Sequence, residues 1–431
     1  MKRRYGLSGY LLGAGAARTG DEMSGPALLL AGTALTGSGP ALLAALTASA
    51  ALGGPVLGAL LDRTPHPGRL LAGTLAAYAA SLTLVCWTLG DLPLPAVLSL
   101  ALLGGLFAPS LAAGWTSRLP YVTDAEHLPR AGALDAASYE LAALAGPALA
   151  GGVALAAGEH AALLTAVALI AGALPAAWSL PGRGTSVSGE RVRGSAGPAC
   201  DGAPLPEPEE VPGTTVPVPA PHPVPRQAPP LTPAGLLPDL RAGFLALLRI
   251  RPLARATLTS TLSHAGLGAF TAVTPALGAQ AFGVESAGAF LPAALAFASL
   301  MASLVLARRP RVAGPDGILL VSTLLLGAAF LLATASPLAA SLLAGLGAGP
   351  QLVALFAIRH REAPERLRGQ IFSTGASLKI SGYAAGAGAA AVCTAHGALL
   401  LAAGCQALAA AGFLALSRTA QRPKPPTGTC G

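Results

Sequence analysis

Long apolar runs, separated by short polar loops, recur from one end of the chain to the other. A run of about 20 apolar residues crosses the roughly 30 Å hydrocarbon core of a bilayer as an α-helix. Helices are expected because lipid offers no partner for open backbone N–H and C=O groups. The pattern predicts twelve transmembrane helices at Leu7–Ala31, Ala41–Leu61, Leu70–Leu89, Pro95–Trp115, Ala131–Ala156, Ala161–Leu180, Leu253–Ala276, Ala287–Ala307, Gly317–Thr334, Leu338–Ile358, Gln370–Cys393 and Ala398–Leu416.

The composition agrees with this pattern and excludes an ordinary soluble domain. Of the 431 residues, 53% are hydrophobic and 11% are charged, whereas soluble domains carry about 25% charged residues. The predicted fold class is therefore an all-α membrane protein.

The lysine and arginine residues indicate the orientation in the membrane. All except Arg18 and Lys379 lie in the termini, in the loops that follow even-numbered predicted helices, or at the membrane edge of those loops. Because short cytoplasmic loops carry the excess of positive charge, we expect both termini in the cytoplasm. The expected location is the plasma membrane, as a multi-pass protein. The net charge of +8 is then a topology signal that faces anionic membrane lipids, and it does not indicate nucleic-acid binding.

A proline-rich segment divides the chain into two halves. Between Leu180 and Leu253 lies a segment with 14 of the 38 prolines, from Pro198 to Pro238, with scattered charges and almost no large apolar residues. This composition is typical of a disordered or polyproline-like linker, which is either a spacer or, through PVPAPHPVPRQAPP, a docking segment for a partner. The predicted organisation is an N-terminal six-helix bundle (1–181), a cytoplasmic linker (182–252), a C-terminal six-helix bundle (253–418) and a cytoplasmic tail (419–431).

The two halves show a weak internal repeat. EHLPRAGALDAAS, from Glu126 to Ser138, and ERLRGQIFSTGAS, from Glu365 to Ser377, match in Glu, Leu, Ala and Ser at an offset of 239 residues. Both stretches lead from a basic loop into a Gly- and Ala-rich helix, the fifth and the eleventh, as a six-plus-six duplication requires. The predicted fold is thus a pair of pseudo-symmetric six-helix bundles.

The loop after the second predicted helix contains a compact polar motif. It reads GALLDRTPHPGRLL and includes Gly58, Asp62, Arg63, Gly68 and Arg69. Asp62 and Arg63 can each pair with a helix end or with an opposite charge of the neighbouring half, and such contacts can form in one conformation and break in another. Small residues four positions apart, such as Gly54 and Gly58, let helix backbones approach closely.

A second motif, AGPALAGG in the fifth predicted helix, contains Gly146, Pro147, Gly151 and Gly152. Together with the loop motif, the twelve helices and the long central loop, this motif makes the chain resemble the major facilitator superfamily of secondary transporters, and it resembles the Gly-Pro signature common in the exporters of that family. The resemblance implies that helices 1, 4, 7 and 10 line a central cavity, that helices 2, 5, 8 and 11 flank the junction of the halves, and that the loop is a gate. The loop departs from the family pattern by the insertion Pro65-His66-Pro67 and by Leu70 in place of a basic residue, and the Gly-Pro spacing exceeds the antiporter form by one residue.

Three ionisable residues, Arg18, Asp21 and Glu22, lie inside the first predicted helix, in AARTGDEMSG. Arg18 falls about 16 Å along that helix, near the bilayer centre, and the spacings place all three on one face. A charge facing lipid at that depth costs about 2.5 to 3.5 kcal/mol on insertion scales, so these side chains must face a polar interior, pair or bind protons. Arg18 and Asp21 can form a structural pair, which leaves Glu22 as the better candidate for binding and releasing protons.

Further ionisable residues lie in the other predicted spans. Glu140 and Lys379 are related by the offset of 239 residues, so the halves place opposite charges at equivalent positions. By the helix roles that the resemblance implies, they join Arg18, Asp21 and Glu22 as candidate proton-coupling and cavity residues, whereas Asp135 is either in the pathway or an anchor of the entry loop. Weaker candidates for substrate contact are Tyr139, His264, Phe270, Gln351 and Tyr383.

The sequence predicts a secondary transporter whose halves rock around a midplane site and export a small organic molecule by proton antiport. Export rests on the Gly-Pro resemblance alone; a proton-coupled uptake symporter and a non-transporting scaffold or receptor are the alternatives. The chain has no phosphate-binding loop with Lys-Ser/Thr, and its five cysteines show no paired spacing, so no enzyme activity, cofactor or metal site is predicted. The expected partners are the substrate, protons and membrane lipids, and the protein is expected to be a monomer.

Overall fold

The computed structural model describes residues 6–181, 233–283, 288, 290–308, 314–390 and 392–418, and the regular structure in these ranges is helical. Short helical turns at Ser110–Gly114, Leu119–Tyr121 and Glu365–Leu367 supplement the α-helices. The α-helices are α1 (Leu7–Thr36), α2 (Gly39–Arg63), α3 (Pro67–Thr88), α4 (Leu94–Gly105), α5 (Leu128–Ala157), α6 (Glu159–Gly172), α7 (Leu174–Trp178), α8 (Pro233–Arg249), α9 (Arg251–Ala272), α10 (Thr274–Phe282), α11 (Phe290–Arg308), α12 (Pro315–Leu332), α13 (Pro337–Glu362), α14 (Arg368–Ala390) and α15 (Ala395–Arg418).

Every predicted span overlaps helical structure. The fourth span consists of α4 and the π-helical turn Ser110–Gly114, and the sixth of α6 and α7. These interruptions lie next to Pro109 and Pro175, which have no backbone N–H to continue a helix. Among the described residues, eight helices are long and apolar enough to cross a membrane by length and composition. The total of twelve transmembrane helices stays a prediction.

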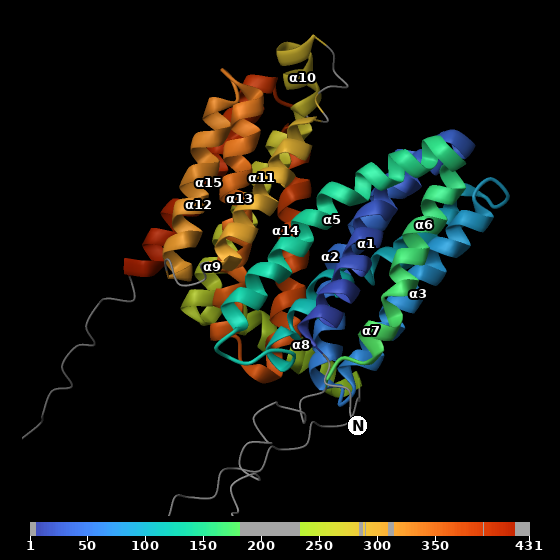
Figure 1. Cartoon of the computed structure of the whole chain (residues 1–431), viewed down its shortest axis with the longest axis horizontal. Coiled ribbons are helices and arrows are strands. Elements are labelled where there is room, and N and C mark those ends of the chain that lie inside the picture. Colours follow the sequence, from blue (N-terminus) through green and yellow to red (C-terminus); the bar gives the residue numbers. More distant parts are fainter. Residues whose placement is uncertain are drawn as a thin grey trace, which may run out of the picture.

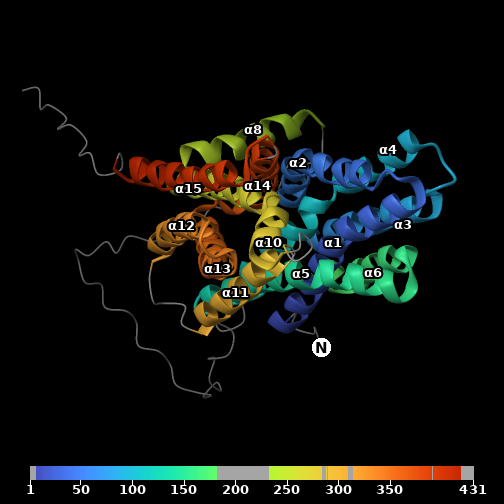
Figure 2. The ribbon, with the colours of Figure 1, turned by 90° about the horizontal axis from the view of Figure 1, so that it is seen from above.

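Helices α1–α7 and α9–α15 form two bundles (Figure 1). Each bundle has its own apolar core, with Leu28 and Trp115 in the first and Phe270 and Phe330 in the second. Seen from above, α2 and α5 of the first bundle lie beside α14 and α11 of the second (Figure 2), and both pairs are in contact. These are the second, fifth, eleventh and eighth predicted helices, which the resemblance places at the junction.

The two bundles meet near the basic end, defined here as the end that holds Arg63, Arg118 and Arg366, and they diverge toward the end that holds α10 (Figure 1). Along this meeting line the Ser377 hydroxyl of α14 donates a hydrogen bond to the carbonyl of Ala50 in α2, at 2.9 Å. One turn further, a Cβ on Gly54 would lie 2.5 Å from the carbonyl oxygen of Ser373. The predicted close approach of backbones at this glycine is therefore confirmed.

The predicted linker contains a helix. Residues 182–232 and the predicted tail 419–431 lie outside the described residues, but Pro233–Arg249 forms α8, which packs against α2, α9 and α14 at the basic end (Figure 1). The expectation of a segment without large apolar residues is wrong here. Leu247 is buried in a cluster with Leu253 and Ile371 because LLPDLRAGFLALLRI carries apolar residues at helical spacing.

Candidate functional site

A cavity of about 390 Å³ lies between the two bundles. Its wall comes from α1, the segment after α4, α5, α9, α13 and α14, so all four helices that the resemblance implies contribute, together with α5 and α14. The lining residues are Asp21, Glu22, Ala108, Pro109, Ala113, Tyr139, His264, Leu352, Phe356, Arg359, Phe372, Ala376, Lys379, Ile380 and Tyr383.

The charges of this central cavity are divided between its walls. Asp21, which is half-buried, and Glu22, which is exposed, come from α1 of the first bundle. Arg359 and Lys379 come from α13 and α14 of the second bundle. A molecule in the cavity therefore meets carboxylates on one side and cations on the other.

A smaller cavity of about 140 Å³ adjoins the central one and shares His264, Leu352 and Lys379 with it. Glu140 of α5 and Lys379 of α14 both line this cavity. The structure thus brings together the two charges that the repeat offset relates.

Two polar side chains of the smaller cavity have hydrogen-bond partners inside the second bundle. The Gln351 amide donates to Ser263 and Thr323, each at 3.0 Å. The Nδ1 atom of His264 lies 2.9 Å from the carbonyl oxygen of Ser260, one turn earlier in α9. Both residues line the cavity while their orientation is set by neighbouring helices.

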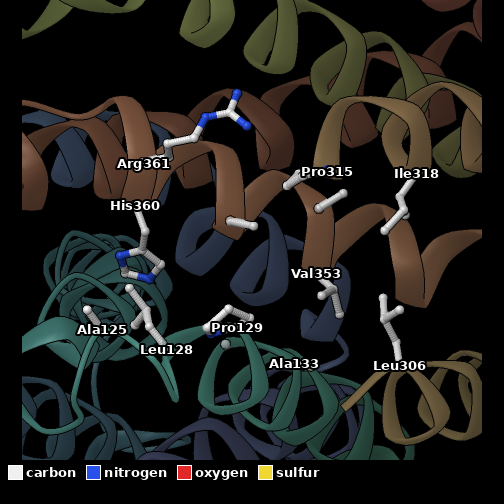
Figure 3. Close-up of a pocket in the computed structure, with 13 residues that line it drawn as sticks. Ala125, Leu128, Pro129, Ala133, Leu306, Pro315, Ile318, Val353, His360 and Arg361 are labelled. Atoms are coloured by element: carbon white, nitrogen blue, oxygen red, sulfur yellow. The ribbon is translucent and has the colours of Figure 1, made fainter. Parts of the chain in front are cut away.

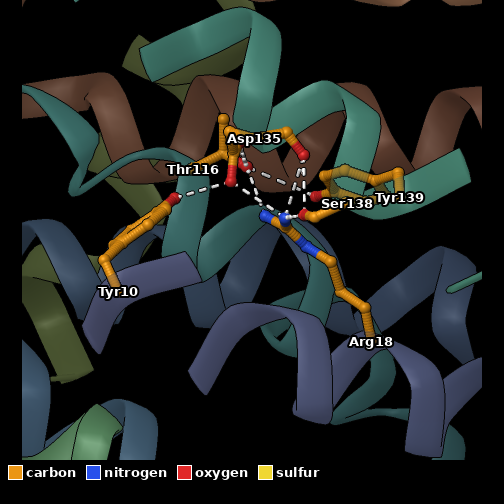
Figure 4. A network of polar contacts seen from close by, with 6 residues as sticks. All are labelled: Tyr10, Arg18, Thr116, Asp135, Ser138 and Tyr139. Carbon is orange, nitrogen blue, oxygen red and sulfur yellow. Dashed lines mark hydrogen bonds and ion pairs between the residues drawn. The ribbon is translucent and has the colours of Figure 1, made fainter. Parts of the chain in front are cut away.

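Arg18 lies in a buried polar cluster between α1 and α5 (Figure 4). Its Nη1 atom forms an ion pair with Asp135 at 2.8 Å, and its Nη2 atom donates to Thr116 Oγ1 at 3.0 Å. Asp135 also accepts hydrogen bonds from the hydroxyls of Tyr10 at 2.9 Å and Thr116 at 2.8 Å. The Tyr139 ring covers the guanidinium, and the Arg18 Cζ atom lies 3.8 Å from the ring centroid.

This cluster separates Arg18 from the other charges of α1. Arg18 pairs with Asp135 and not with Asp21, because α5 offers a completely buried carboxylate that also accepts hydrogen bonds from two hydroxyl groups. Among the described residues, the central cavity lining includes Asp21 and Glu22 but not Arg18. The pairing could be suspected from the sequence only because Asp135 is another acid within a predicted span.

At the basic end, Asp62 closes the junction between the bundles. Its two carboxylate oxygens accept hydrogen bonds from the backbone N–H groups of Gly369 and Gln370, each at 2.8 Å. These groups belong to the first turn of α14, where the helix dipole favours an anion. The predicted pairing of Asp62 with a helix end of the other half is therefore confirmed. Gly58 lies one turn earlier in α2, and a Cβ added there would lie 2.5 Å from the Gln370 Cα.

The other residues of the loop motif contact different partners. Arg63 pairs with Asp239 of α8 at 2.6 Å. Gly68 faces the backbone carbonyls at the end of α7, where a Cβ would lie 2.6 Å from the Ala177 oxygen, and Arg69 lies over the Trp178 ring at 5.5 Å. Gly68 and Arg69 therefore bind the loop to its own bundle, whereas Asp62 reaches across the junction.

An apolar layer lies between the central cavity and the basic end. Tyr139 of α5 packs on Phe356 of α13, with ring centroids 5.6 Å apart, and Phe356 packs on Phe372 at 5.8 Å. Ala133 and Ala307 belong to the same buried cluster. Together with Asp62, this layer is called the basic-end gate below.

Below the gate, the Tyr121 hydroxyl donates a hydrogen bond to Glu365 at 2.8 Å, again between the bundles. Burial raises the pKa of Tyr121, so this hydroxyl keeps its proton at neutral pH. A further cavity of about 400 Å³ opens here between α5 and α11–α13, and its wall is mostly apolar (Figure 3). His360 lines it, and neither ring nitrogen has a hydrogen-bond partner within the described chain.

The motif of the fifth helix is explained in part. A Cβ on Gly146 would lie 2.7 Å from the Cβ of Glu22, so this glycine lets α5 approach α1 at the cavity carboxylate. Pro147 is exposed, and the positions of Gly151 and Gly152 have no heavy atom within 4 Å of an added Cβ. Only Gly146 is therefore tied to the site by packing.

Two other sequence expectations have clear outcomes. Tyr383 lines the central cavity, as a substrate-contact candidate should. Phe270 does not: it is completely buried and stacks on Phe330 at 5.1 Å, because its side of α9 faces the core of the second bundle.

Arg359 is the cavity residue that the sequence analysis missed. The predicted tenth span ends at Ile358, which made Arg359 a loop cation, but α13 continues to Glu362 and the Arg359 side chain is 1% exposed. No local signal in the sequence places Arg359 in the cavity, since the basic residues that follow it are typical of a cytoplasmic loop.

Comparison with known proteins agrees with this architecture. The chain is similar to the crystal structure of the human organic anion transporter MFSD10 (16% identity, 96% of this chain and 100% of that chain covered, TM-score 0.65). It is also similar to a bacterial homologue of the iron transporter ferroportin in an outward-facing state (15% identity, 96% and 99% covered, TM-score 0.70). No curated protein sequence gives a match. The family model of the Major Facilitator Superfamily matches residues 10–387, and the chain therefore belongs to this superfamily.

Proposed function

We propose that this membrane transporter moves a small organic molecule in exchange for protons, by alternating access of the central cavity. The observation that carries the proposal is the position of Asp21 and Glu22 on the wall of a cavity of about 390 Å³ between the two bundles. Placing ionisable groups at membrane depth costs free energy unless they face a polar pathway. Asp21 and Glu22 face such a pathway in the central cavity.

The basic-end gate supports the alternating-access part of the proposal. Asp62 bridges α2 to the first turn of α14, and Tyr121 bridges to Glu365, so a few contacts hold the bundles together at this end. Breaking these contacts while the bundles close at the other end would expose the cavity to the opposite side of the membrane. Neither step requires unfolding of a helix.

Proton coupling is assigned to Asp21 and Glu22. Proton uptake cancels the charge of a carboxylate and so lowers the cost of enclosing it between two apolar bundles. Gly146 places the α5 backbone directly against Glu22, so a change at this carboxylate is transmitted to a junction helix.

Export is proposed as the direction, and the plasma membrane as the location. Export rests on the resemblance of Gly146-Pro147 to the exporters of the family, and the distribution of basic residues supports termini in the cytoplasm. One solved neighbour is an organic anion transporter and the other a homologue of an iron transporter, so the fold alone does not select a substrate.

Counterflow in proteoliposomes tests this function. A panel of organic anions, cations and neutral compounds is offered with and without a pH gradient, and luminal pyranine reports proton movement. Glu22→Gln and Asp21→Asn are expected to lose pH-driven transport, whereas the exposed control Asp124→Asn keeps it. Full pH-driven transport by both cavity variants would contradict the proton role. Protons moving with the substrate would indicate an uptake symporter, and absence of any counterflow a scaffold or receptor.

A further inference from the structure

We propose that Arg359 is the anion-binding group of the central cavity, and that the transported molecule is an organic anion with a carboxylate or a similar oxyanion. This proposal rests on the proposed transport function and deepens it by naming the substrate class. It is carried by the surroundings of the Arg359 guanidinium, which lies in the cavity wall.

The guanidinium is buried, and two of its three nitrogens have no hydrogen-bond partner in the part of the chain that the structure describes. Arg359 is 1% exposed, and its Nε and Nη2 atoms have no hydrogen-bond partner among the described residues. Buried cations are normally paired, because an unpaired charge loses its hydration without compensation. Other arginines of the described chain follow that rule: Arg18 pairs with Asp135, Arg63 with Asp239 and Arg255 with Asp316.

The packing around Arg359 holds the guanidinium at the cavity. A Cβ on Gly375 would collide with Nη2 and lie 2.8 Å from Nη1, so the absence of a side chain at this position makes room for the group. Phe372 lies on the same helix as Gly375, and its ring centroid is 5.8 Å from the Cζ atom of Arg359. The guanidinium is thus held between a bare backbone and an aromatic ring, which leaves its donors for a ligand.

The neighbouring charges favour an anion at this wall. Lys379 follows Gly375 by one turn of α14 and lines the same cavity. Both cations repel a positively charged group, and a neutral group would leave the guanidinium charge uncompensated. A carboxylate fits best, because the planar fork of arginine binds two oxygens at once. Asp21 and Glu22 on the opposite wall remain available for protons.

Binding to the purified full-length protein tests this directly. Thermal stabilisation is measured for matched compounds: benzoate, benzamide and benzylamine; indole-3-acetate, indole-3-acetamide and tryptamine; and phenylphosphonate. At least one anion of this panel is expected to stabilise the protein at millimolar concentration, while its amide and amine counterparts do not. Arg359→Gln should weaken that binding about tenfold or more, Arg359→Lys should weaken it less, and Gly375→Ala should weaken it by displacing the guanidinium.

Controls separate this proposal from folding defects and from the proton role. Arg130→Gln removes an exposed arginine by the same chemical change and should leave anion binding unchanged. Elution volume and melting temperature without ligand report folding, and Arg359→Lys provides a variant that keeps the charge. Absence of stabilisation by every anion, binding limited to amides or amines, or anion binding unaffected in Arg359→Gln would each overturn the proposal. The binding measurement uses no pH gradient. Full pH-driven transport by Glu22→Gln would therefore contradict the proton role, while the anion-binding result for Arg359 would still stand.

Discussion

The carboxylate of Asp62 accepts a hydrogen bond from the backbone N–H of Gly369 at 2.8 Å, across the junction between the two bundles. This contact joins the last turn of α2 to the first turn of α14, and the neighbouring N–H of Gln370 adds a second bond to the same carboxylate. A helix N-terminus and a single acid thus join the bundles at the basic end, beside the Tyr121–Glu365 hydrogen bond. The predictions below follow from this gate and from the buried pair behind it.

Asp62→Asn is expected to weaken the gate, because the amide offers one acceptor oxygen and turns an N–H₂ group toward the N–H donors of α14. Loss of a charge-assisted hydrogen bond costs about 1.5 to 3 kcal/mol, so the population open at the basic end should rise roughly tenfold or more. The measurement is the rate at which a membrane-impermeant maleimide labels Ala376→Cys in a cysteine-free background, in inside-out vesicles. Asp124→Asn is the matched control, and equal rates in both variants would show that Asp62 is not a gate residue.

Gly58→Ala is expected to separate the bundles at the same end. The added methyl group would lie 2.5 Å from the Gln370 Cα, which is backbone and cannot rotate away. Overpacking of this kind costs about 1 to 3 kcal/mol. The same labelling assay should show faster modification of Ala376→Cys. Gly73→Ala, at a position with no heavy atom within 4 Å, should label at the original rate.

The Arg18–Asp135 pair is expected to contribute to stability as a unit. Arg18→Gln or Asp135→Asn alone leaves one buried charge unpaired and should lower the free energy of unfolding by about 3 to 5 kcal/mol. The double variant Arg18→Gln with Asp135→Asn should lose less than the sum of the two single losses, since no charge is then left unpaired. Thermal unfolding in detergent measures all variants, with Arg130→Gln as the surface control. Strictly additive losses in the double variant would contradict the pairing.

Tyr121 gives a pH dependence at the junction. Because burial raises its pKa, its contribution is fully present below the unfolded-state pKa of about 10 and is lost as pH rises through the higher folded-state value. Between neutral and strongly alkaline pH, the melting temperature of the original protein should fall more steeply than that of Tyr121→Phe. Parallel curves for the two proteins would exclude Tyr121 as the titrating group.

The positions of the membrane helices could be predicted from the sequence because lipid imposes a local rule. A span must be apolar, helical and about 20 residues long whatever its neighbours are. The end-capping role of Asp62 was equally readable, since an acid at a helix end with nearby glycines needs only a helix N-terminus opposite. The repeat offset identified Glu140 and Lys379 without coordinates, and the structure places them on one cavity.

Pairings between distant residues were decided by the tertiary structure alone. Arg18 chooses Asp135 over the nearby Asp21 because α5, and not the next turn of α1, supplies a buried carboxylate at the right depth. Arg359 belongs to the cavity and Phe270 to the core because of how α13 and α9 are rotated against their neighbours. Hydropathy records whether a segment is buried in the membrane, but the direction of a side chain around its helix depends on packing between helices, which no single segment encodes.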